Sequence, residues 1–202
     1  MEIAIKEVFD MSWPTLVVLL SIFIIMRITM YFNGSQRKIV IHEELFNLLF
    51  MTYLLVLFRL VTSQDVSTLH STNLIPFREI LRYNVGTSEF NRQVIGNILL
   101  FIPFGFFISK YCKIRGLGTI TVVSFLTSFV IESVQHFIGR SFDVDDIILN
   151  VVGGIIGFLL YIALKAIRDH SPRIFRKDWV LNLISIVIII LIAFYIIKYI
   201  IL

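Results

Sequence analysis

The chain has 202 residues, of which 57% are hydrophobic and 16% are charged, and its formal net charge is +4. Soluble domains usually carry about 25% charged residues, so these charges are too few to cover a water-facing surface. The composition therefore excludes a wholly soluble protein and predicts that lipid surrounds much of the chain. The single cysteine, Cys112, also excludes an intramolecular disulfide and a zinc site built on cysteines.

Six apolar stretches are long enough, or nearly so, to cross a membrane as helices. A helix needs about 20 apolar residues to cross about 30 Å of hydrocarbon. The sequence therefore predicts an all-α, polytopic transmembrane bundle of about six spans. The predicted spans are residues 13–32, 39–61, 94–111, 117–138, 146–167 and 179–202.

The third predicted span contains a proline, Pro103. Proline lacks a backbone donor and clashes with the preceding helical turn, so we predict that this span is kinked or broken there. The longest connection, residues 62–92, follows the second span. Within it we expect a short re-entrant or interfacial helix at residues 76–83.

Lysine and arginine predict the orientation of the spans. They gather in short loops between apolar runs, as is typical of membrane proteins, so the positive net charge does not indicate a nucleic-acid partner. The loops after the first, third and fifth predicted spans are the richer in these residues, and such loops face the cytoplasm. Both termini and the loop at residues 139–145 should then lie outside the cytoplasm.

Several polar residues lie in or beside the third, fourth and fifth predicted spans. Polar groups inside a membrane are costly, so each is a candidate functional residue. Under the predicted topology they fall at one membrane face, which favours a shared site. The candidates are Asn97, Glu132, Gln135, Arg140, Asp143, Asp145, Asp146 and Asn150, with Arg78 and His136 as secondary members.

A structural interpretation of these residues stands beside the functional one. Asp145 or Asp146 can cap the fifth predicted helix, where a negative charge is favourable, and Arg140 can pair with Asp143. Glu132 follows three apolar residues, so we expect it either to pair with Arg140 or to be protonated because of desolvation.

Four segments of the chain resemble the VanZ-like family of bacterial membrane proteins. They are residues 73–77, 97–105, 132–135 and 140–153, and the resemblance covers roughly residues 40–165. It implies a multi-pass protein of the bacterial cell membrane, linked to resistance to the glycopeptide antibiotic teicoplanin, and it adds Asn73 to the secondary candidates. It does not imply a particular reaction.

The resemblance also suggests how the chain is organised. Residues 1–38 would form an N-terminal span and loop, residues 39–168 the VanZ-like membrane domain, and residues 169–202 a C-terminal span. We expect no cofactor and no resident metal, and the oligomeric state is open.

Three functional hypotheses follow. In the first, which we favour, the polar cluster recognises a membrane lipid, a cell-wall precursor or the antibiotic itself. Arg78, Arg82 and Arg140 could then hold phosphate or carboxylate groups. In the second, the protein is an enzyme acting on a lipid-linked substrate, with Glu132 as acid or base assisted by His136, or with a divalent cation on the aspartates. In the third, it is a small transporter whose path includes Asn97 and Glu132, although no internal repeat supports that idea.

Overall fold

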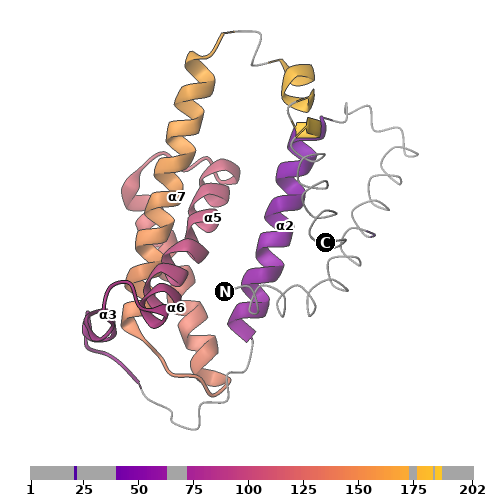
Figure 1. Cartoon of the computed structure of the whole chain (residues 1–202). Coiled ribbons are helices and arrows are strands. Elements are labelled where there is room, and N and C mark those ends of the chain that lie inside the picture. Colours follow the sequence, from indigo (N-terminus) through magenta and orange to yellow (C-terminus); the bar gives the residue numbers. More distant parts are fainter. Residues whose placement is uncertain (1–20, 22–39, 63–71, 173–176, 184, 188–202) are drawn as a thin grey trace. The chain divides into compact units, whose positions relative to one another are not determined.

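The computed structural model describes residues 21, 40–62, 72–172, 177–183 and 185–187 (Figure 1). The chain forms two compact units, one from Met1–Thr52 with Lys177–Leu202 and the other from Tyr53–Arg176. The predicted first span lies outside the described residues apart from Ser21, and the predicted sixth is described only as far as residue 187. The expected total of six spans therefore stays a prediction.

The regular secondary structure of the described residues consists of helices, which confirms the predicted all-α class. Its main helices are α2 (Ile41–Thr62), α5 (Gly96–Tyr111), α6 (Leu117–Phe137) and α7 (Val144–His170), and a short helix, α3, covers Arg78–Arg82. Four stretches are long and apolar enough to cross a membrane, and they correspond to the second through fifth predicted spans. The short helix expected in the long connection is also present, as α3.

The helix that corresponds to the third predicted span differs from the expectation at its start. It begins earlier, with α4 (Ser88–Phe90) and a π-helical segment, η1 (Asn91–Ile95), which leads directly into α5. α5 continues through Pro103 to Tyr111, so the helix is not broken at the proline, and a kink there stays a prediction. The π-helical segment ends just before Asn97, and such segments frequently occur near functional sites.

Helix α7 packs closely on α5 and also contacts α6 (Figure 1). The α5–α7 contact depends on glycines, because a Cβ added at Gly105 would overlap the backbone of Gly154. A Cβ at Gly153 or Gly157 would likewise meet the backbone of α5. These glycines therefore let α7 approach α5 closely.

In the unit that contains the start of α2, a polar contact joins α2 to a residue near the end of the described chain. The backbone N–H of His42 donates to Asn182 Oδ1 at 3.1 Å, and His42 Nδ1 lies 3.0 Å from the same oxygen. The first N–H groups of a helix have no partner within the helix. Asn182, from the short apolar helix Asp178–Val187, therefore satisfies one such donor of α2.

Candidate functional site

The polar candidates gather in the unit Tyr53–Arg176, where α6 ends and α7 begins. The segment before α3 runs beside this turn: Asn73 N–H donates to the carbonyl of Phe142 at 2.8 Å, and Val144 N–H donates to the carbonyl of Asn73 at 3.1 Å. These two bonds form an isolated parallel bridge between Asn73 and Asp143. The long connection is thereby attached to the start of α7.

Asp145 holds α3 in place. Its side chain is only 1% exposed, and its Oδ1 accepts a hydrogen bond from the N–H of Phe77 while its Oδ2 accepts from Glu79 at 2.7 Å and Ile80 at 3.2 Å. The carboxylate therefore caps the first turn of α3 from a distant part of the sequence. The structural interpretation of this aspartate is correct in kind, but the helix that it caps is α3 rather than α7.

Asp143 is the residue that caps α7. Its Oδ1 accepts hydrogen bonds from the backbone N–H of Asp145 at 2.8 Å and from the side-chain amide of Asn73 at 2.9 Å. Burial raises the pKa of the Asp143 carboxyl above its ordinary value, and the charges of Asp145 and Glu79 raise it further, while the two hydrogen bonds act in the opposite direction. Acidic groups therefore crowd this end of the helices.

Glu132 is 2% exposed and connects α6 to the turn that follows it. Its Oε2 accepts a hydrogen bond from the N–H of Asp143 at 3.1 Å. With the Gln135 amide oriented to suit its neighbours, its nitrogen donates to Glu132 Oε1 at 3.0 Å and its oxygen accepts from Arg140 Nη1 at 3.3 Å. Gln135 thus links the glutamate and the arginine that were expected to pair, and Arg140 also donates to the carbonyl of Leu60 at 3.2 Å.

Two asparagines tie the neighbouring helices to this cluster. The Asn97 amide on α5 donates to Asp146 Oδ1, and the Asn150 amide on α7 donates to Ser128 Oγ on α6 at 2.9 Å. Asn150 lies deeper in the bundle and is buried. The structure thus brings together polar residues from the third, fourth and fifth predicted spans.

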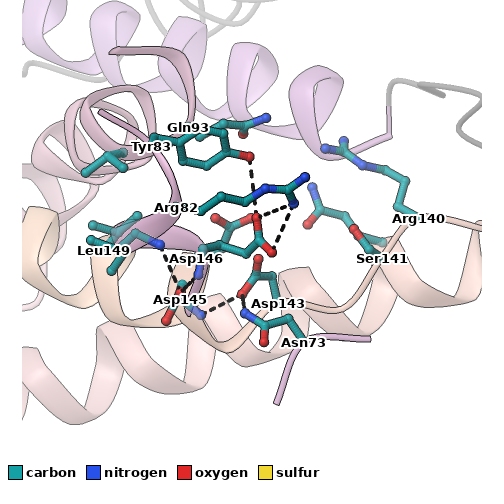
Figure 2. A pocket seen from close by; sticks show the side chains of 14 residues that line it. Asn73, Arg82, Tyr83, Gln93, Arg140, Ser141, Asp143, Asp145, Asp146 and Leu149 are labelled. Atoms are coloured by element: carbon teal, nitrogen blue, oxygen red, sulfur yellow. Dashed lines mark hydrogen bonds and ion pairs between the residues drawn. The ribbon is translucent and has the colours of Figure 1, made fainter. Parts of the chain in front are cut away.

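These groups surround a pocket of about 310 Å³ (Figure 2). Six of the candidates line it, whereas Asn97, Glu132 and Asn150 do not. The secondary candidates Arg78 and His136 are exposed and do not line it. The lining residues are Asn73, Glu79, Ile80, Arg82, Tyr83, Gln93, Val94, Gln135, Arg140, Ser141, Asp143, Asp145, Asp146 and Leu149.

Two polar residues of the pocket, Glu79 and Tyr83, were not among the predicted site residues, whereas Arg82 was expected only as one of the arginines that could hold an anionic group. Glu79, Arg82 and Tyr83 come from α3 and the residue after it, at spacings of three and four that place them on one helix face. Arg82 forms an ion pair with Glu79 at 3.2 Å, and Tyr83 Oη donates to Glu79 Oε2 at 3.5 Å. Burial, and then the charge of Glu79, raise the pKa of the Tyr83 hydroxyl. The spacing was visible in the sequence, but nothing there indicated that α3 folds over the start of α7.

The polar groups of the pocket are varied in charge and type. Within the described ranges, no group of three or more acidic, histidine or cysteine side chains is placed to hold a metal ion. Asp145 illustrates the reason, because both of its oxygens already accept backbone hydrogen bonds. The pocket instead offers two guanidinium groups, several carboxylates and neutral amides, which can orient a polar group of a ligand.

Fold and site together describe a helical membrane protein with a charged, polar pocket at one end of its apolar helices. The chain belongs to the VanZ/LLP1 family, whose pattern it matches over residues 15–165. A similar curated protein is Protein VanZ of Enterococcus faecium, which is 29% identical over 127 residues, or 62% of this chain and 71% of the relative. No solved structure matches this chain. The expected family is therefore confirmed.

Proposed function

We propose that this protein recognises the polar group of a lipid or cell-wall precursor at the outer face of the bacterial membrane, and thereby lowers susceptibility to teicoplanin. The observation that carries the proposal is the pocket in which Arg82 and Arg140 lie with polar side chains at the end of apolar helices. Arginine presents a planar fork of donors that fits phosphate and carboxylate groups. Family membership supports the link to glycopeptide antibiotics.

The experiment compares Arg140→Lys with wild type in a teicoplanin-sensitive host. Lysine keeps the charge but loses the fork that allows two parallel hydrogen bonds. We expect normal amounts of protein in the membrane and reduced protection. Arg78→Lys is the matched control, because Arg78 is exposed and lies outside the pocket; it should protect as wild type does. Full protection by Arg140→Lys at matched expression would show that recognition does not depend on this guanidinium.

The outer location of the pocket is tested separately by labelling. Ser141 lines the pocket and is exposed, whereas the single cysteine, Cys112, follows the last residue of α5. An impermeant thiol reagent applied to intact cells should label Ser141→Cys in a Cys112→Ser background and leave native Cys112 unlabelled. Labelling of Cys112 alone would invert the proposed orientation and place the pocket in the cytoplasm.

A further inference from the structure

The charges of the pocket restrict what it can hold. Four acidic residues line it, Glu79, Asp143, Asp145 and Asp146, against two basic residues, Arg82 and Arg140. An anion alone would be attracted to the arginines but repelled by the excess of carboxylates. A ligand that carries a positive group as well as a negative one would match both sets of charges.

The hydrogen bonds of the carboxylates show which of them can meet a ligand. Asp145 is committed to the backbone around α3 through both oxygens. Asp143 Oδ1 accepts from Asn73 and Asp145, and Asp146 Oδ1 accepts from Asn97. The second oxygen, Oδ2, of Asp143 and of Asp146 accepts no hydrogen bond from the described residues, and both side chains line the pocket (Figure 2). These two oxygens can accept N–H groups from a bound cation.

The basic side of the pocket includes Arg82. Its Nη1 donates to both oxygens of Glu79, at 3.4 and 3.2 Å. A guanidinium has five N–H donors, so this contact leaves donors on Nε and Nη2 for an anionic group of a ligand. Glu79 lies one turn earlier on the same helix, and both residues of this ion pair line the pocket.

Exposed apolar side chains lie on the same segment of the chain as Glu79 and Arg82, which line the pocket. Leu74, Ile75, Phe77 and Leu81 flank or belong to α3 and are exposed. Large exposed apolar side chains beside a charged site suit an amphiphile, whose hydrocarbon part can lie against them while its polar group enters the pocket.

We propose that the pocket binds the zwitterionic polar group of an amphiphile, with a primary ammonium against Asp143 and Asp146 and a phosphate or carboxylate against Arg82. This inference rests on the proposed function and adds the ammonium to it. Two sources offer such a group: an aminated phospholipid such as phosphatidylethanolamine, and a lipid-linked wall precursor whose peptide has a free amine.

The experiment measures ligands retained by the full-length, detergent-purified protein in native mass spectrometry. One arm compares phosphatidylethanolamine with phosphatidylglycerol, which has the phosphate but no ammonium. The other compares a lipid-linked wall precursor bearing a free amine with the same precursor after acetylation of that amine. We expect the amine-bearing ligand of at least one arm to be retained about tenfold more strongly, which corresponds to one charge-assisted contact.

Variants connect the preference to named residues. Asp146→Asn keeps the acceptor for Asn97 but removes the charge, so it should abolish the preference for the amine-bearing ligand. Glu89→Gln is the matched control, because Glu89 is exposed on α4 and lies outside the pocket. Arg82→Gln should weaken retention of every amphiphile that carries a phosphate or carboxylate, with or without an ammonium, whereas Arg78→Gln should not. If Asp146→Asn does not fold, Asp143→Asn and the acetylated ligand test the same contact.

Each outcome is decisive. A preference for phosphatidylethanolamine alone identifies a membrane lipid as the source, and a preference for the amine-bearing precursor alone identifies the cell wall. Equal retention of ligands with and without the ammonium, dependent on Arg82, would overturn the zwitterion and leave the proposed function intact. Retention that depends on neither Arg82 nor Arg140 would overturn both proposals.

Discussion

Helices α5 and α7 meet in two ways along their length, and the two regions contrast in what they contain. In the middle of α7, glycines bring the two backbones so close that a Cβ added at Gly105 on α5 would overlap the backbone of Gly154 on α7. At the start of α7, the contact is made by the Asn97 amide and the Asp146 carboxylate beside an open pocket. The same pair of helices is therefore joined by close backbone packing in one region and by polar side chains in the other.

The difference separates residues that build the site from residues that can use it. Close packing leaves no room for substitution, since protein interiors lack space for an added atom. The polar region is less uniform, because Asp145 is committed to the backbone of the α3 segment whereas its neighbour Asp146 keeps one oxygen toward the pocket. The two adjacent aspartates thus differ in their hydrogen bonding. We therefore expect mutations in the close-packed and polar regions to have different effects.

The largest effect is expected in the close-packed region. Gly105→Ala would place a Cβ against the backbone of Gly154, and overpacking of this kind typically costs about 1–3 kcal/mol. We expect a clear fall in the thermal unfolding midpoint of the detergent-solubilised protein. Gly118→Ala is the matched control, because a Cβ at Gly118 on α6 meets no atom within 4 Å and alanine favours a helix. Equal midpoints for the two variants would show that the glycine contact does not limit stability.

An effect of similar size, but confined to the α3 segment, is expected for Asp145→Asn. The amide cannot accept through its nitrogen, so at least one of the N–H groups of Phe77, Glu79 and Ile80 loses its acceptor, at a cost of about 1–3 kcal/mol. Hydrogen exchange of these amides should accelerate while the α5–α7 contact stays protected. The control is Asp169→Asn, whose carboxylate forms an exposed ion pair with Arg168 and contributes little to stability.

Unchanged exchange at these three amides in Asp145→Asn would mean that α3 does not depend on the remote cap. It would also weaken the contrast between Asp145 and Asp146. Faster exchange throughout α5 and α7 would be equally informative, because the polar and close-packed regions would then unfold as one.

Periodic and compositional features of the sequence predicted most of the described fold. Four apolar stretches became helices of the expected type because length and hydropathy determine what can cross a bilayer. The start of the third predicted span at Ser88 and its π-helical segment were missed, because neither feature can be recognised from hydropathy.

The site was predictable as a group of residues but not as a set of contacts. The free-energy cost of burying a charged side chain in a membrane identified Glu132 and the aspartates as members of the site. The bridging position of Gln135 and the capping of α3 by Asp145 depend on contacts between residues far apart in the chain, or on side-chain orientation. Arg78 was preferred to Glu79 and Tyr83 as a candidate, although it is exposed and does not line the pocket. Charge alone does not indicate which side of a short helix faces inward.

The smallest expected effect concerns Asp143 and depends on pH. Its pKa is raised in the folded protein, chiefly by burial, so ionisation costs folding free energy. The stability associated with this carboxyl is fully present below the ordinary aspartate pKa of about 3.9 and is lost as the pH rises through the raised pKa. Asparagine keeps Oδ1 as an acceptor for Asn73 and Asp145 but cannot ionise. At neutral pH, Asp143→Asn should therefore be slightly more stable than wild type, by less than about 1 kcal/mol because water screens a partly exposed group.

The measurement is the thermal midpoint of both proteins in detergent across the acid range, where the difference should shrink toward zero as the pH falls below the ordinary aspartate value. Asp169→Asn again serves as the control, since Asp169 is exposed beside Arg168 and its replacement should produce no comparable gain at neutral pH. A variant that is less stable than wild type at neutral pH, with the deficit closing in acid, would mean that the ionised carboxylate stabilises the fold. The acidic crowding at the start of α7 would then be balanced within the protein, and the pocket would have no need of a cation from a ligand.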